Sequence, residues 1–221
     1  MKLSLLAILF FFCSFVHASA DDSLTSKKKV YEQDLFINTT FFIKQIVSLS
    51  NSNIAISPYI VGYKCFFTKH HGIRVSVGGS LNHSKQFPDS TFVTITSTGT
   101  LNSRVGYEYR CKMGKLWSFF TGIDVLFDYS YNNVKVNSTD DLVTTNSNTW
   151  DIGGGPIAGI QLNIGKRVAL FTETAFYYTY GRANEKVTSV SFPELNNNKA
   201  VAINQSGQFL LPTSVYFVFK F

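Results

Sequence analysis

Apolar and polar residues alternate along most of this 221-residue chain, from about residue 36 to the last residue, and no helical period is sustained. Strict alternation is typical of β-strands that have one apolar and one polar face. Membrane-crossing strands need about 9–11 residues, and the alternating segments are long enough. The pattern predicts eight strands, at roughly 35–49, 54–67, 72–84, 98–112, 116–131, 150–164, 168–184 and 207–221.

The connectors between the predicted strands differ in length in a regular way. A short link follows the second, fourth and sixth strands, whereas long polar connectors follow the third, fifth and seventh. The connector after the first strand, at 50–53, departs from this alternation because it is short. Short turns on one side and longer loops on the other are typical of outer-membrane barrels, whose turns lie in the periplasm. The short links are 68–71, 113–115 and 165–167, and the long connectors are 85–97, 132–149 and 185–206.

The composition narrows the class of protein further. Hydrophobic residues make up 45% of the chain, aromatic residues 15% and charged residues 15%. An ordinary soluble domain has about 25% charged residues, so this chain is poor in charge. After the N-terminus no stretch reaches the ~18 apolar residues of a membrane helix, and the other backbone solution for a membrane is a closed barrel. A secreted β-sandwich rich in Tyr and Phe remains the alternative at this point.

The two faces of the predicted strands favour the barrel over the sandwich. The polar face is rich in glycine and small residues, which suits a narrow, crowded interior. The apolar face carries aromatic residues at both ends of the strands, as in the two interfacial girdles of membrane barrels. We therefore predict an all-β fold, an eight-stranded antiparallel transmembrane up-and-down β-barrel. The girdle residues are Phe67, Tyr109, Trp117 and Phe221 on the turn side and Tyr129, Tyr131, Tyr178 and Tyr180 on the loop side.

Residues 1–20 have the features of a secretory signal peptide. Lys2 supplies the positive start, residues 3–16 form a largely apolar stretch, and Ala18–Ser19–Ala20 provides the small residues of a cleavage site. We expect cleavage after Ala20, a periplasmic leader at 21–34 and the barrel domain at 35–221. Such an exported barrel is expected in the cell outer membrane of a Gram-negative bacterium.

Charged residues fall on the inward face of the predicted strands. Side chains fill the interior of an eight-stranded barrel, and buried charges must be paired or hydrogen-bonded. We therefore predict a lumenal ion-pair network, with Arg104 and Asp124 as the foremost cross-strand pair. An ion pathway is the alternative, but a plug of salt bridges is favoured because eight strands leave no continuous aqueous channel. The predicted members are Lys44, Lys64, Arg74, Arg104, Glu108, Arg110, Asp124, Asp128, Glu173 and Lys220.

Segments such as ISPYIVGYK, HGIRVSVGGS and GPIAGIQLNIGKRVAL carry a family resemblance. With the signal peptide, the strand pattern and a terminal phenylalanine, they make residues 35–221 resemble the small outer-membrane barrels of the OmpA and OmpX type. The chain is more similar still to the "outer membrane protein beta-barrel domain" proteins of Bacteroidetes. The resemblance implies that the barrel-assembly machinery and periplasmic chaperones recognise the last strand. Its signal residues would be Val215, Phe217, Phe219 and Phe221.

Catalysis is a possibility that the residues do not favour. Some barrels of this size modify lipid A, such as the palmitoyltransferase PagP and the deacylase PagL, and such chemistry needs a nucleophile with a base in hydrogen-bond reach. His70 and His71 fall in a predicted periplasmic turn, while His83 and Ser84 are strand neighbours that point to opposite faces. We therefore assign no catalytic residue, no metal site and no cofactor.

Cysteine content and net charge exclude few further classes. Cys65 and Cys111 fall on non-adjacent strands and face outward, so we expect two free thiols rather than a disulfide. The net charge of +6 comes without a nucleic-acid-binding motif, and attraction to anionic membrane lipids is the better interpretation.

The expected function is that of a non-enzymatic integral outer-membrane barrel whose extracellular loops mediate surface contact or envelope integrity. The alternatives are a lipid A-modifying enzyme of the PagP or PagL kind and a small-solute pore. The expected partners are outer-membrane lipids and lipopolysaccharide, with the assembly machinery and chaperones during biogenesis. Nucleic acid is not expected, and no motif indicates an extracellular partner.

Overall fold

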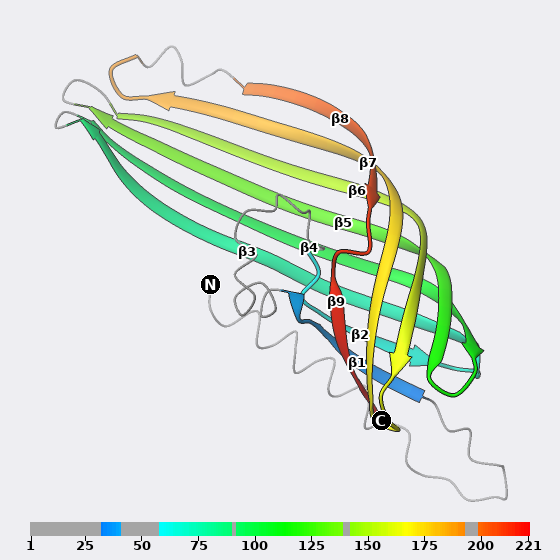
Figure 1. Cartoon of the computed structure of the whole chain (residues 1–221). Helices are drawn as coiled ribbons and strands as arrows, with labels where there is room; N and C mark the ends of the chain where they lie inside the picture. Colours follow the sequence, from blue (N-terminus) through cyan, green and yellow to red (C-terminus); the bar gives the residue numbers. More distant parts are fainter. Residues whose placement is uncertain (1–31, 41–57, 90–91, 139–141, 193–198) are drawn as a thin grey trace, which may run out of the picture. The chain divides into compact units, whose positions relative to one another are not determined.

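The strands of the molecule close into a ring. The computed structural model describes residues 32–40, 58–89, 92–138, 142–192 and 199–221. Strand β1 pairs with β2 and β9, and β7 pairs with β6 and β9, so eight antiparallel strands form a closed barrel (Figure 1). The predicted all-β fold with an eight-stranded up-and-down ring is therefore confirmed. The described strands are β1 (Glu32–Asn38), β2 (Val61–Phe66), β3 (His71–Asp89), β4 (Phe92–Met113), β5 (Trp117–Ser138), β6 (Leu142–Asn163), β7 (Val168–Ser189), β8 (Lys199–Leu210) and β9 (Val215–Lys220).

Three tight turns define one end of the barrel, which we call the turn end. They join β2 to β3, β4 to β5 and β6 to β7, where the sequence predicts its three short links. In the second of them Gly114 has a φ of 98°, a left-handed conformation that glycine adopts without steric cost. The start of β1 and the end of β9 lie at the same end, because Lys220 N donates to the Arg167 carbonyl and Phe221 N donates to the Gln33 carbonyl.

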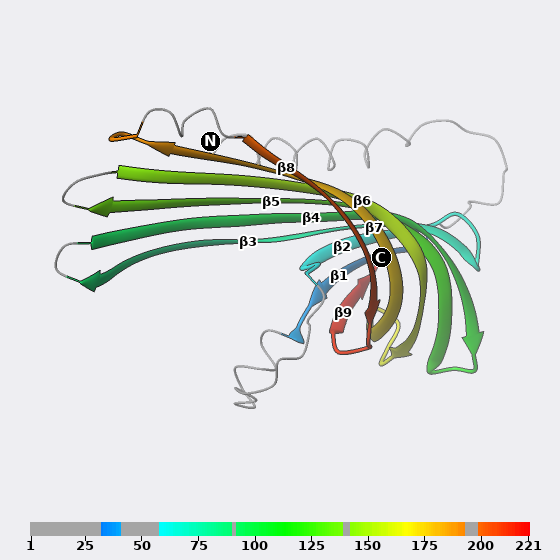
Figure 2. The ribbon, with the colours of Figure 1, turned by 90° about the horizontal axis from the view of Figure 1, so that it is seen from above.

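The strands at the opposite end, which we call the long-strand end, extend far beyond their predicted bounds. Strands β4 to β7 have 22 residues each, and together with β3 and β8 they include most of the residues expected in the long connectors 85–97, 132–149 and 185–206. Figure 2 shows β3 to β8 side by side over this length. The prediction of loops here was wrong because polar composition was taken as a loop signal. Thr and Val, such as Thr94 and its cross-strand partner Val136, favour strands even where the two faces do not differ in polarity.

The first and last predicted strands also differ from the structure. Strand β1 begins at Glu32, so the last residues of the expected leader 21–34 belong to the barrel. The predicted strand 207–221 is divided into β8 and β9, with residues 211–214 between them. Pro212 interrupts the ladder because proline has no N–H to donate. Both parts pair with β7, β9 nearer the turn end and β8 toward the long-strand end.

The outward face of the ring is apolar over a height that matches a bilayer. Ile123 and Val125 are each 59% exposed, between Trp117 near the turn end and Tyr129 farther out. At about 3.3 Å per residue the strand from Trp117 to Tyr129 covers roughly 40 Å, which a tilt of about 40° reduces to roughly 30 Å. We call the aromatic residues at its far end the outer girdle. They are Tyr129, Tyr131, Trp150, Tyr178 and Tyr180.

Apolar rings fill part of the interior, which the sequence did not reveal. Phe171 stacks on Tyr216 at 4.5 Å between ring centroids, and Phe36 and Phe120 meet Phe171 edge-on. The rings are accommodated by glycines on neighbouring strands: a Cβ on Gly62 would lie 2.1 Å from Phe36 Cζ.

Several predictions fall on residues outside the described ranges. These are the signal peptide with its cleavage residues Ala18 and Ala20, most of the leader, Lys44 and the connector 50–53. In the described part of the chain, no helix has both the length and the apolar character needed to cross a membrane.

We predict that Gly62→Ala destabilises the barrel by about 1–3 kcal/mol, because Phe36 is held by the rings around it and cannot yield to the new methyl group. Urea unfolding followed by tryptophan fluorescence measures this effect. Gly165→Ala is the matched control, since nothing lies within 4 Å of its added Cβ. Equal midpoints for the two variants would contradict the packing described for the interior.

Candidate functional site in the barrel interior

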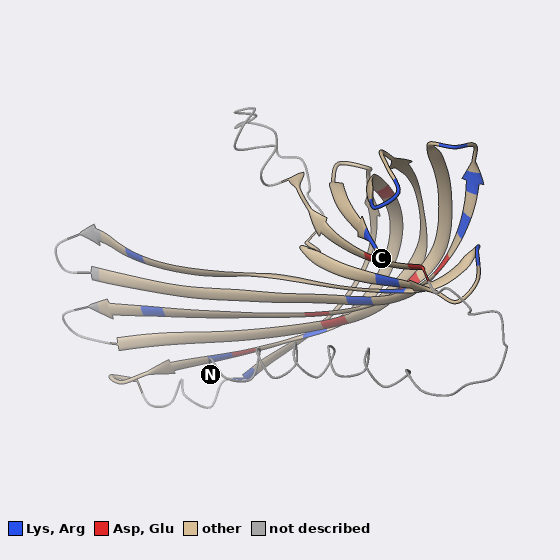
Figure 3. Ribbon diagram, turned by 90° about the horizontal axis from the view of Figure 1, so that it is seen from below, with Lys and Arg blue, Asp and Glu red and all other residues tan. Residues whose placement is uncertain are grey.

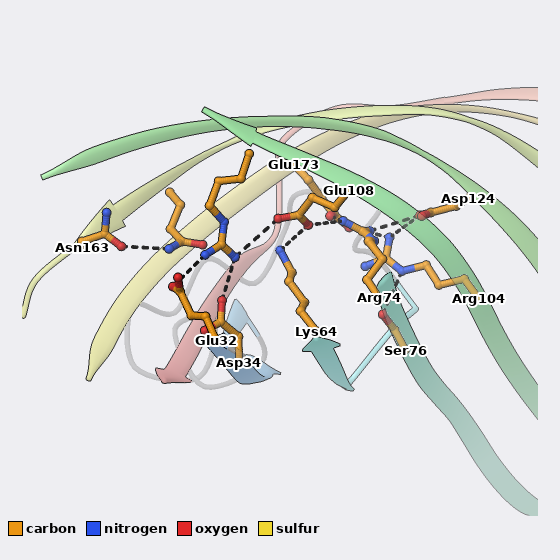
Figure 4. Close-up of polar contacts among 12 residues, drawn as sticks. Glu32, Asp34, Lys64, Arg74, Ser76, Arg104, Glu108, Asp124, Asn163 and Glu173 are labelled. Carbon is orange, nitrogen blue, oxygen red and sulfur yellow. Dashed lines mark hydrogen bonds and ion pairs between the residues drawn. The ribbon is translucent and has the colours of Figure 1, made fainter. Parts of the chain in front are cut away.

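Alternate residues of seven strands bring charged side chains into the barrel interior. Every second residue of a strand points to the same face, so an uninterrupted register aligns the inward residues of neighbouring strands. The pairs Lys64 with Arg74 and Asp34 with Lys220 are direct cross-strand neighbours. We call the resulting set the interior network (Figure 4). Its members are the cations Lys64, Arg74, Arg104, Arg110 and Lys220 and the anions Glu32, Asp34, Glu108, Asp124 and Glu173.

Glu108 lies at the centre of the interior network. Its Oε2 is 2.7 Å from Lys64 Nζ and 3.6 Å from Arg74 Nη1, and its Oε1 is 3.5 Å from Arg110 Nη2. Lys64 Nζ also lies 4.2 Å from the centroid of the Phe171 ring, so the ammonium gains a cation–π contact. One carboxylate thus connects the cations of three strands.

Two arginines and two carboxylates form the part of the network nearer the outer girdle. Arg74 Nη2 lies 2.8 Å from Glu173 and 3.1 Å from Asp124, while Arg104 Nη1 lies 2.5 Å from Glu173 and 3.4 Å from Asp124. Tyr177 Oη donates to Asp124 at 2.9 Å, and the Arg104 guanidinium lies 4.1 Å from the centroid of the Tyr59 ring. The arginines are therefore fixed by both charge and aromatic contacts.

Arg110 organises the part of the network at the turn end. Its Nη2 lies 2.7 Å from Asp34 and its Nη1 lies 3.1 Å from Glu32, while the Phe66 ring lies against the guanidinium at 3.8 Å. Lys220 Nζ lies 3.6 Å from Glu32 and donates to an Asn163 side-chain oxygen at 2.7 Å. Strands β1, β4 and β9 are thereby linked across the seam where the two ends of the described chain meet.

The structure brings most of the predicted network residues together. Arg104 and Asp124, the foremost predicted pair, are among the ion pairs. Asp128 differs: it accepts a hydrogen bond from Asn102 Nδ2 at 2.9 Å, and no described cation lies within ion-pair distance of it. Lys44 lies outside the described residues. The residues brought together are Lys64, Arg74, Arg104, Glu108, Arg110, Asp124, Glu173 and Lys220.

Sequence reasoning missed Glu32 and Asp34 because the barrel was expected to begin at residue 35. A signal for them was present: Glu32, Asp34, Phe36 and Asn38 follow one another at every second position and share one face. Continuing the alternation of the first strand backward would have placed both carboxylates inside.

The network is balanced in charge and, apart from Glu32 and Lys220 at the turn end, buried. Its five cations and five anions cancel, and Arg74, Asp124 and Glu108 are fully buried. Removing one partner from a buried ion pair leaves an uncompensated charge, which is far more costly than an exposed one. Chemically, such an arrangement can fill and rigidify the lumen, but it offers no unpaired charge of one sign to select an ion.

The histidines contact residues across strands. His70 Nδ1 lies 2.9 Å from the Arg110 carbonyl oxygen, and His71 forms a hydrogen bond with the Tyr107 hydroxyl. His83, considered in the sequence beside Ser84, is instead paired with Ser97, whose Oγ lies 2.8 Å from His83 Nδ1. This exposed pair has no carboxylate among its hydrogen bonds in the described structure.

Thiols and potential metal ligands are scattered. Cys65 and Cys111 are free and lie on β2 and β4, which are separated by β3. Within the ranges that the structure describes, no three His, Cys, Asp or Glu side chains are grouped so as to hold a metal ion.

Comparison with known proteins finds distant structural neighbours and no match in sequence. No family model and no curated protein matches the chain. A major outer membrane protein from Thermus thermophilus is 12% identical, with a TM-score of 0.46 over 87% of this chain and 100% of that chain. CarO from Acinetobacter baumannii is 11% identical, with a TM-score of 0.34 over 86% and 95% of the respective chains. The strand pairing of the chain itself establishes the barrel.

We predict that Glu108→Gln lowers the free energy of unfolding by about 3 kcal/mol or more, because three buried cations lose their shared negative charge. The matched control is Asp128→Asn, which removes a carboxylate outside the ion pairs and should cost less than about 1 kcal/mol. Urea unfolding in detergent, followed by the fluorescence of Trp117 and Trp150, measures both variants. An equal decrease in the free energy of unfolding of both variants would show that the ion pairs of Glu108 do not stabilise the barrel.

Proposed function

We propose that the protein is a non-enzymatic integral outer-membrane β-barrel with a plugged lumen, whose strands beyond the membrane provide a surface for contacts that maintain the envelope. The observation that carries this proposal is the inversion of the two faces. Isoleucine, valine and aromatic residues are exposed outside the ring, whereas five cations and five anions are paired within it. In water this arrangement would expose a large apolar surface, and a bilayer removes that cost.

The direction of the barrel follows from the lengths of its ends. Short turns of membrane barrels face the periplasm and the longer side faces outward. The turn end, where β1 begins and β9 ends, is therefore the periplasmic end in this proposal. The long-strand end then extends into the extracellular space, and its extent supports a role at the cell surface.

The contents of the lumen argue against the alternative of a small-solute pore. Phe36, Phe120, Phe171 and Tyr216 pack against one another, and the interior network continues on both sides of Lys64. Interiors of eight-stranded barrels are just filled by side chains, and here both charged and aromatic groups contribute to that filling.

We expect the protein to fractionate with the outer membrane, to migrate as a heat-modifiable band and to show no stepwise conductance in planar bilayers. The physical reason is that paired charges and stacked rings fill the lumen that the described strands enclose. A general porin reconstituted in the same way is the positive control. Recovery in a soluble fraction would refute the membrane placement, and regular conductance steps would refute the plug.

The enzymatic alternative makes a different prediction. If the exposed His83–Ser97 pair has no catalytic function, lipid A extracted from cells that overproduce the protein should have the same mass spectrum as lipid A from cells with the empty vector. Loss or gain of an acyl chain that disappears in His83→Ala would instead establish a lipid-modifying activity.

A further inference from the structure

The two faces of the sheet at and beyond the outer girdle carry opposite charges. All described cations of this region lie on the outward face, the same face as the apolar band. The acidic residues Asp128, Asp151 and Glu185 lie on the inward face. Figure 3 shows the Lys and Arg positions along the outer part of the long strands. The cations, all exposed, are Lys85, Lys135, Arg182, Lys186 and Lys199.

The strand registers assign these faces. Strand β7 pairs with β6 and β8 in one uninterrupted register, so Lys186 is on the face of Phe176 and Tyr178, and Glu185 is on the face of Glu173. Likewise Lys135 is on the face of Ile123 in β5. Strand β3 keeps its register with β4 up to Gln86, so the same rule places Lys85 on the outward face.

Four of the cations lie in two adjacent outward-facing rows across β3 to β8, and we call them the cation belt, namely Lys85, Lys135, Lys186 and Lys199. Lys186 and Lys199 are direct cross-strand partners, in the same row of the sheet as His83 and Ser97. Lys85 and Lys135 lie in the next outward-facing row, joined through Ile95. No described carboxylate lies within ion-pair distance of the cation belt, so its charge is not neutralised by the described part of the protein.

Polar, uncharged side chains lie beside the cations in these two rows, and the apolar Ile95 lies between Lys85 and Lys135. His83 forms a hydrogen bond with Ser97, and Asn133 donates to Asn146. Thr144 follows Lys135 in its row. Amides, hydroxyls and an imidazole beside ammonium groups suit a ligand that carries hydroxyl groups as well as negative charges.

The height of the belt identifies the kind of lipid that can reach it. From the row of Tyr129 in the outer girdle, Asn133 and Lys135 lie roughly 13 and 20 Å farther along the strand at about 3.3 Å per residue. With a tilt of about 40° this corresponds to roughly 10–15 Å above the girdle. Phospholipid headgroups occupy only about 5–8 Å beyond the hydrocarbon core, so the belt lies above them. A larger, sugar-based headgroup extends to this height.

We propose that the cation belt binds the phosphorylated saccharide headgroup of an outer-leaflet glycolipid, that is, of lipopolysaccharide. The ammonium groups pair with phosphates, and the neighbouring Asn, Ser and His side chains contact sugar hydroxyls. Because the cation belt is on the same outward face as the outer girdle and the apolar band, the acyl chains of the bound glycolipid would lie against the apolar band. The assignment rests on the proposed membrane placement and adds the residues and the chemical class of the partner.

The test compares two variants of equal charge change. In the belt variant Lys85, Lys135, Lys186 and Lys199 are all changed to Gln. In the control variant Lys112, Lys115, Lys166 and Arg167 of the turn end are changed to Gln, three of which line a hollow beside Phe219 and Phe221. Both proteins are refolded in detergent, and their heat-modifiable bands establish that they fold. Binding of purified lipopolysaccharide, of its dephosphorylated form and of phosphatidylglycerol is then titrated by microscale thermophoresis.

We expect the belt variant to bind lipopolysaccharide several hundredfold more weakly than the wild type, since each of the four Lys near an anionic lipid surface contributes about a factor of five. The control variant should bind like the wild type, and dephosphorylated lipopolysaccharide should bind weakly to all three proteins.

Three outcomes would overturn the assignment: equal losses in both variants, undiminished binding of the dephosphorylated form, or equally tight belt-dependent binding of phosphatidylglycerol. In each of them the heat-modifiable band still reports a folded barrel, so the failure concerns the belt alone. Loss of that band in the wild type, with recovery in a soluble fraction, would instead remove the proposed function.

Discussion

A charge inside this narrow ring has no bulk water to solvate it, and the rest of the structure depends on satisfying that constraint. Glu108 meets it for Lys64, Arg74 and Arg110 at once, and these cations come from three strands. The contacts therefore exist only when the registers of β2, β3 and β4 are all correct. A slip of one residue would turn the charges outward against the apolar band. The interior network thus specifies the pairing of the strands as well as filling the lumen.

The alternation of residues was sufficient to predict the ring, the three turns and most of the network. It succeeded because inward and outward environments differ strongly, so the parity of a residue such as Asp124 or Ile123 decides its face. It failed where that contrast is lost. Beyond the outer girdle apolar and polar residues are mixed on both faces, and the residues there were taken for loops although they continue the strands. Phe120 and Phe171 were missed inside because apolar character was assumed to mean an outward position.

The misplaced start of the first strand shows a second limit of pattern reasoning. Glu32 and Asp34 precede the apolar residues of β1, and a boundary placed at the first apolar residue excludes them. Their side chains nevertheless complete the charge balance around Arg110. The partners of a buried charge can lie at the polar end of a strand, where hydropathy gives no signal but the need for neutralisation does. Counting unpaired inward cations would have pointed to the missing carboxylates.

The lumen and the outer sheet divide the molecule into a part that stabilises and a part that faces the surroundings. Balanced charge, deep burial and ring packing make the interior rigid, whereas the cations outside are exposed and unpaired by the described carboxylates. Charges of this second kind contribute little to stability, so their placement on one face is free to serve binding. The same strands therefore carry paired, buried charges on their inward face and exposed, unpaired cations on their outward face.

The seam between β1 and β9 has a consequence for how the molecule is made. Asp34 pairs in register with Lys220, so the ring closes only when segments from the two ends of the described chain meet. Contacts of such sequence separation form late and slowly in folding. Until then the facing edges of β1 and β9 present unpaired backbone groups that can join other strands. Closure is therefore a single late event, and the time before it is when the chain is most exposed to aggregation.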